Sequence, residues 1–305
     1  MRRAFATAVL LLIPLAALAG EAPYYGYTYR NIEVTAAGNG TYAVNLARYC
    51  VRLDGMLSRI LGITATDRAP VHLYALPEGQ VRELLGDASF TSYRLTAAGA
   101  TILTSNVTAH DSEYWGAYYG YTAALLAGDG RFTGPDWYLL GVPLVFAATK
   151  YEGNRAHLGM VDRGYGRQLG QGSSRIPMRR FLSLKRASIF DDAATRRVYD
   201  AEAWGLAHEI FVEGWHRAEF TRYLELMRQG TPEPEAFAAS FKVTYEQLDK
   251  DFAYIVERGR ALVYTLQSPD PEAAGATAEP LSAAELKERL ERLAAAFPRE
   301  PQPGQ

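Results

Sequence analysis

The sequence of 305 residues has one cysteine, Cys50, and no group of cysteines and histidines with the spacing of a zinc finger or zinc ribbon. An internal disulfide and a structural zinc site of that kind are therefore excluded. A strong excess of charge is also missing, because 32 Lys and Arg stand against 34 Asp and Glu and both signs are mixed along the chain. This pattern indicates no nucleic-acid partner. With 48% hydrophobic residues, the composition is typical of a globular protein stabilised by packing.

Long apolar runs are missing after the first 19 residues. Residues 1–19 begin with Met and two Arg, continue with an apolar run over 8–19, and end in Ala-Leu-Ala. This pattern predicts a signal peptide that is cleaved before Gly20, since a spanning helix needs about 20 apolar residues. We therefore expect a bacterial periplasmic or secreted protein with no stable membrane insertion after cleavage.

Apolar periodicity predicts an α+β fold. Its expected form is a mixed N-terminal β-sheet with helices over about 28–110, followed by a mostly helical C-terminal half over about 111–267. Strands are expected at 31–35, 71–75 and 101–105. Helices are expected at 41–61, 78–85, 113–126, 135–149, 201–213, 218–228, 233–241 and 245–258. The glycine-rich residues 159–172 are expected to form a surface loop.

The C-terminal residues differ in composition from the rest. A Pro- and Ala-rich linker is expected over 268–281, an amphipathic helix over 282–298 and a frayed tail over 299–305. Ser282 and Glu285 have the spacing of a capping box. The helix is expected either to fold back on the domain or to bind a partner, and the linker suggests that folding does not require it.

Two neighbouring segments, residues 118–126 (YYGYTAALL) and 135–141 (PDWYLLG), carry a resemblance. They resemble the zinc-site helices of the peptidase MA-like family of gluzincin metallopeptidases. There, one helix carries His-Glu-aromatic-Thr-His and the next begins Pro-x-Trp-aromatic-x-Glu-Gly. The resemblance covers about residues 28–258 and implies one gluzincin-like domain over 20–267.

The residues for zinc chemistry are missing from these segments. The family needs two His four residues apart, a Glu beside the first as general base, and a third ligand from the next helix. These positions hold Tyr119, Gly120, Ala123 and Leu140 here. The resemblance therefore implies a degenerate member with no catalytic residue, no zinc and no other cofactor.

Residues 208–216 contain a second group of histidines and glutamates, which are residue types that bind metals. His208 and Glu209 are adjacent, but the residue four positions after His208 is Val212, so the second ligand of a zincin helix is missing. Glu209, Glu213 and His216 would share a face of a continuous helix, whereas Gly214 is typical of a helix end. We therefore expect His208 to be a packing residue and predict no metal site.

The sequence thus predicts an exported, catalytically inactive metallopeptidase-like protein that retains a cleft for an extended peptide or a periplasmic protein. Residues 101–105 match the strand that edges the cleft in gluzincin-like folds. Five aromatic residues are candidates for lining this cleft, with core packing as the alternative: Tyr118, Tyr121, Trp137, Tyr138 and Tyr199. Two other functions stay open, an active hydrolase or metallopeptidase with an unrecognised site and a scaffold that acts through its C-terminal helix. The basic residues between Arg175 and Arg186 are typical of a solvated face.

Overall fold

A computed structural model describes residues 23–62, 69–86, 91–96, 99–106, 114–128, 134–161, 163–170, 175–259, 261–268 and 276–298. The expected signal peptide (1–19) and the expected tail (299–305) lie outside the described residues. Among the helices that are described, none combines the length and the apolar character that crossing a membrane requires.

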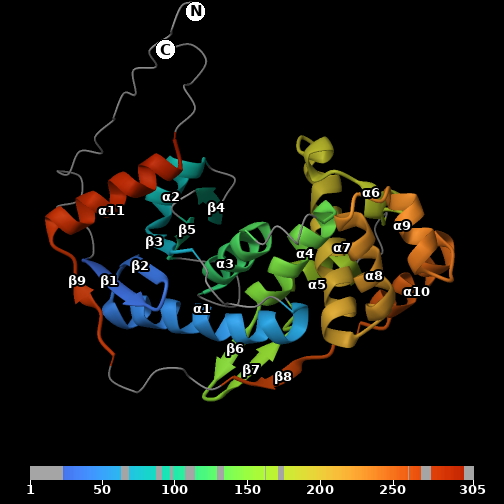
Figure 1. The fold of residues 1–305 in the computed structure, drawn as a ribbon, viewed down its shortest axis with the longest axis horizontal. Helices are drawn as coiled ribbons and strands as arrows, with labels where there is room; N and C mark the ends of the chain where they lie inside the picture. The colour runs from blue at the N-terminus through green and yellow to red at the C-terminus, as the bar shows by residue number, and fades with distance from the viewer. Residues whose placement is uncertain are drawn as a thin grey trace, which may run out of the picture.

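A six-stranded mixed sheet forms the N-terminal part of the molecule (Figure 1). Its order is β4-β5-β3-β2-β1-β9, with β2, β3 and β5 parallel and the remaining strands antiparallel to their neighbours. The strands are β1 (Tyr24–Tyr29), β2 (Ile32–Ala37), β3 (Val71–Leu76), β4 (Thr91–Thr96), β5 (Gly99–Ser105) and β9 (Glu279–Pro280). Nearly all side chains of the parallel strands are buried, because helices cover both of their faces.

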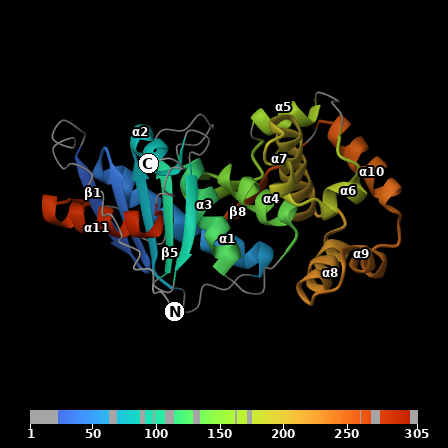
Figure 2. The ribbon, with the colours of Figure 1, turned by 90° about the horizontal axis from the view of Figure 1, so that it is seen from above.

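Helices cover this sheet on both sides (Figure 2). On one side, α1 (Gly40–Leu61) and α3 (Trp115–Gly128) pack on side chains such as Leu73. On the other, α2 (Glu78–Leu85) and α11 (Ala283–Ala296) pack on the alternate side chains, such as Tyr74. Cys50 lies on the buried face of α1, where desolvation raises the pKa of its thiol well above the ordinary value. It is therefore a core residue.

The C-terminal helix α11 folds back on the sheet. Leu293, only 1% exposed, and Phe297 complete an apolar cluster with residues of β3 and β5. Arg289 Nη1 donates to Val34 O at 3.0 Å and to Thr35 Oγ1 at 3.1 Å, and the capping box at Ser282 is formed. These contacts make the helix part of the packing of the sheet, which its linker composition did not indicate.

Helices dominate the second half, so the α+β class with a helical C-terminal half is confirmed. The central helix is α7 (Ala193–His208), and a π-helical turn, η3 (Glu209–Glu213), continues it. Around it lie α4 (Asp136–Ala147), α5 (Arg163–Gly170), α6 (Met178–Ser183), the 3-10 helix η2 (Arg186–Ile189), α8 (Arg217–Arg228), α9 (Glu233–Ser240) and α10 (Tyr245–Glu257). The surface loop expected over 159–172 is wrong in part, because α5 forms there and packs beside α7.

A second, three-stranded sheet connects the two parts of the chain. It contains β6 (Lys150–Glu152), β7 (Arg155–Leu158) and β8 (Tyr264–Gln267) in the order β6-β7-β8. The buried guanidinium of Arg52 on α1 donates to Ser268 Oγ at 3.2 Å and to Gly153 O at 2.8 Å. One cation therefore holds α1, the β6–β7 turn and the end of β8 together.

We predict that Leu293→Ala lowers the free energy of unfolding by about 2–4 kcal/mol, because it leaves a cavity between α11 and the sheet. The measurement is urea denaturation followed by circular dichroism. The matched control is Leu95→Ala, whose side chain is 44% exposed and should cost about 0.5 kcal/mol or less. Equal midpoints for the two variants would mean that α11 is dispensable for the fold.

Candidate functional site

The four positions that match the zinc site of the family lie on α3 and α4. Ala123 and Leu140 are buried, and neither they nor Gly120 carries a side-chain donor for a metal. Gly120 faces β5, where an added Cβ would lie 2.6 Å from Ile102 Cγ2. Because α3 packs so closely on β5, a glutamate side chain does not fit at position 120. Tyr119, the fourth position, stacks on Trp115 with ring centroids 5.4 Å apart.

The five candidate cleft aromatics are all buried in the structure and contact other core side chains. The Tyr121 hydroxyl donates to Asp54 Oδ1 at 2.9 Å, and the Tyr199 hydroxyl donates to Leu184 O at 3.3 Å. The other three make ring contacts: Tyr118 with Tyr49 and Tyr151, Trp137 with Phe181 and Phe220, and Tyr138 with Phe211. They occupy packing positions here, and their role in lining a cleft stays a prediction.

The expectation that residues 101–105 edge a cleft is wrong. These residues belong to β5, which lies between β3 and β4 and is paired on both sides. The strand at this edge of the sheet is β4, which sequence reasoning missed, and β9 lies at the other edge. Alternation of Thr91, Tyr93 and Leu95 with more polar neighbours was the available signal.

The outer side of β4 has a defined backbone pattern. Ala100 N donates to Pro70 O at 2.9 Å, so Ala100 points its backbone groups toward β3 and Thr101 points its groups toward β4. Arg94 is opposite Thr101, so it faces β5. Tyr93 and Leu95, which alternate with it, present N–H and C=O groups outward, and the Tyr93 carbonyl accepts from Arg94 Nη1 at 3.1 Å. Within the part of the chain that the structure describes, no strand pairs with this side.

Tyr119 on α3 interacts both with this edge and with an ion pair of the helical part. Arg186 donates to both carboxylate oxygens of Asp200 at 3.0 Å, and this hydrogen bonding raises the pKa of Arg186. Tyr119 interacts electrostatically with Arg186, Asp200 and Tyr93, while burial raises the pKa of Tyr119 to about 12. Tyr119 is therefore a neutral hydrogen-bonding group at neutral pH. We call the outward backbone of Tyr93 and Leu95, with these side chains, the β4-edge site.

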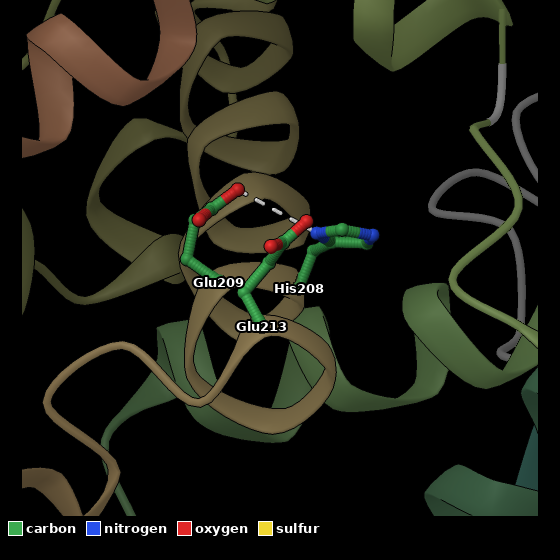
Figure 3. Close-up of side chains that lie close together, drawn as sticks. All are labelled: His208, Glu209 and Glu213. Carbon is green, nitrogen blue, oxygen red and sulfur yellow. Dashed lines mark ion pairs between the residues drawn. The ribbon is translucent and has the colours of Figure 1, made fainter. Parts of the chain in front are cut away.

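A separate group of metal-type ligands lies at the end of α7 (Figure 3). One ligand atom from each of His208, Glu209 and Glu213 lies within 4.8 Å of the others. The expectation that Gly214 ends the helix is confirmed, since Gly214 adopts φ 82°. His216 instead precedes α8 and contacts Glu219 at 3.6 Å, so it does not join Glu209 and Glu213 on one face.

Another carboxylate, Glu202, is buried in the middle of α7. Desolvation raises the pKa of Glu202 from 4.5 to about 7, against the lowering effects of Arg175 and the backbone N–H of Ile176. Arg175 Nε lies 3.3 Å from Glu202 Oε1. The basic residues between Arg175 and Arg186 were expected to form a solvated face. Two of them instead pair with acids on α7, Arg175 with Glu202 and Arg186 with Asp200.

No protein-family model matches the chain, and a search of the curated proteins finds no match. The resemblance to gluzincins therefore remains a prediction from the residue pattern.

We predict that the folded protein loses stability as pH rises from about 4.5 to about 7. Over this range the unfolded chain ionises Glu202, whereas the folded state retains the proton because its pKa is about 7. Glu202→Gln should remove this contribution, with each unit of pKa difference equal to about 1.4 kcal/mol. Urea denaturation of the two proteins at pH 4.5 and pH 7.5 measures the effect. An unchanged pH dependence in Glu202→Gln would show that Glu202 ionises normally.

Proposed function

We propose that this protein is an exported, catalytically inactive metallopeptidase-like protein that binds an extended peptide segment at the β4-edge site. The observation that carries the proposal is the outward side of β4, which no described strand covers. The segment can come from a peptide or from an unfolded part of a periplasmic protein.

The chemistry of binding is the addition of one strand to the sheet. The outward N–H groups of Tyr93 and Leu95 and the C=O group of Leu95 supply main-chain hydrogen bonds that are independent of the peptide sequence. Tyr119 adds a neutral hydroxyl nearby, and Arg186 and Asp200 form an ion pair next to Tyr119. Natural sheets usually protect such an edge with Pro, charged side chains or a bulge; β4 has no Pro and no bulge, and its one charged residue, Arg94, covers only the carbonyl of Tyr93.

The absence of catalysis is proposed from the zinc-site positions. Gly120, Ala123 and Leu140 have no group that holds a metal or activates water. A metallopeptidase with another site is less well supported, because His208 and Glu209 are buried and do not belong to the β4-edge site. A scaffold acting through α11 is also less well supported, since the apolar side of that helix already packs on the sheet.

Export is part of the proposal and is tested by itself. The expected outcome is a mature chain that begins at Gly20 and occurs in the periplasm or medium of the producing bacterium. Mass spectrometry of the intact protein measures its N-terminus. A chain that retains Arg2 and sediments with membranes would contradict export as a cleaved protein.

We predict that Leu95→Pro abolishes peptide binding, because proline removes one outward N–H and leaves the pairing of β4 with β5 intact. The probe is a library of fluorescent acetylated heptapeptides, and binding is read as fluorescence polarisation. Leu95→Ala is the matched control, since it removes the side chain and retains the N–H. Its affinities should stay within about threefold of those of the parent.

The same peptides provide a cleavage assay by mass spectrometry. Binding without cleavage is expected for the parent protein. Cleavage would contradict the proposed inactivity, and unchanged binding by Leu95→Pro would contradict the β4 edge as the binding site.

A further inference from the structure

We propose that His208, Glu209 and Glu213 bind one divalent transition-metal cation, with zinc as the best fit. This inference is independent of the β4-edge site, because different residues form the two sites. It also departs from the expectation, made from the sequence, that the protein has no metal. Three observations carry it: the tautomer of His208, the charge of the group and the form of the helix.

The hydrogen bonds of His208 define its tautomer. Its Nε2 lies 3.2 Å from Gly159 O and 3.1 Å from Leu262 O, and carbonyl oxygens only accept, so Nε2 carries a proton. In the neutral imidazole, Nδ1 therefore has a free lone pair. Metal-binding histidines show the same arrangement, in which one ring nitrogen donates to a carbonyl and the other binds the metal.

The free nitrogen of His208 points at carboxylate oxygen. Nδ1 lies 3.6 Å from Glu209 Oε1, and the structure gives this atom no hydrogen bond to any described residue. An N–H···O hydrogen bond would measure about 2.7–3.2 Å, whereas two ligands about 2.1 Å from one zinc ion lie about 3.4 Å apart. The His208 side chain is only 1% exposed.

Among the residues that the structure describes, the group has no positive partner. Glu209 is 9% exposed and Glu213 is half-buried, and two carboxylates in this setting repel each other. Among the described residues, no Lys or Arg forms an ion pair with either of them. Glu209 Oε1 instead lies 3.6 Å from His208 Nδ1. A divalent cation would neutralise the two negative charges. One imidazole nitrogen with two carboxylate oxygens suits zinc better than magnesium, which prefers oxygen ligands alone.

The π-helical turn brings the three residues together. In a regular α-helix, residues 208 and 213 would lie about 140° apart around the axis. The i→i+5 pattern of η3 reduces this angle and places both on one side of the helix with Glu209, as Figure 3 shows. π turns of this kind occur frequently at functional sites.

The same residues hold the segment that leads into β8, residues 261–263. Leu262 N donates to Glu213 Oε1 at 2.5 Å, while Leu262 O accepts from His208. Gly159 has φ 82°, and an added Cβ there would lie 2.9 Å from His208 Nε2, so only glycine allows this approach. A cation at this place would therefore join the end of α7 to two other segments, and its expected role is structural.

The test uses the full mature protein after dialysis against EDTA. Zinc chloride is titrated by calorimetry, and the expected result is one site per chain with a Kd of about 1 μM or tighter. Saturating zinc should also raise the melting temperature by several degrees, because it binds the folded state. Magnesium chloride at the same concentration should have no effect on either measurement.

Two variants and one control assign the site. Glu213→Gln and His208→Gln should each weaken zinc binding at least about tenfold, since each removes a ligand. Glu219→Gln is the matched control, because it makes the same chemical change beside His216 on α8, and its zinc affinity should equal that of the parent. Circular dichroism of the metal-free proteins establishes that each variant is folded.

The alternative is an imidazolium ion of His208 paired with the carboxylates and no metal. It predicts that the parent binds no zinc at 1 mM, which would overturn the proposal. Zinc binding that is equal in the parent, in Glu213→Gln and in Glu219→Gln would overturn it as well, because the metal would then lie elsewhere. If the Gln variants fail to fold, the parent protein is tested by NMR. The proposal is then overturned if zinc does not shift the ¹⁵N resonances of the His208 imidazole.

Discussion

Burial of the six-stranded sheet on both faces is the constraint on which the rest of the structure depends. Apolar side chains of its parallel strands are buried on both sides, so each face requires a layer of helices. The layer of α1 and α3 comes from nearby sequence, whereas the opposite layer needs α11 from the end of the chain. The close approach of α3 also determines residue type, because Gly120 leaves no room for a side chain against Ile102. Tight packing of α3 on β5 therefore excludes a glutamate at position 120.

The helix α7 organises the other half in a comparable way. Three polar side chains along this helix have different partners: Asp200 forms an ion pair, Glu202 forms a buried salt bridge and His208 lies at a π turn. Each is matched by a group from another element, so the helix is surrounded by polar contacts as well as apolar ones. A buried charge without such a partner would cost several kcal/mol. The group at His208 is the place where that matching is incomplete among the described residues.

The two proposed sites would serve different purposes. The β4-edge site lies at one edge of the six-stranded sheet, and its backbone groups are the general means by which a sheet recognises an extended chain. The cation site lies at the end of α7 beside the segment that leads into β8, where a metal would act on stability.

The sequence by itself determined most of the helices, the parallel strands and the α+β class, because apolar periodicity and end signals are local properties. Asn39, Gly62 and the Ser282 capping box are examples, and each marks the end of a helix where it was expected. It did not determine that β5 is interior or that β4 forms the edge, because strand order depends on contacts between residues far apart in the chain. Nor did it indicate the grouping of His208 with Glu213, since an α-helical periodicity separates them. Only the tertiary structure, through a π turn held by Gly159 and Leu262, brings these two side chains together.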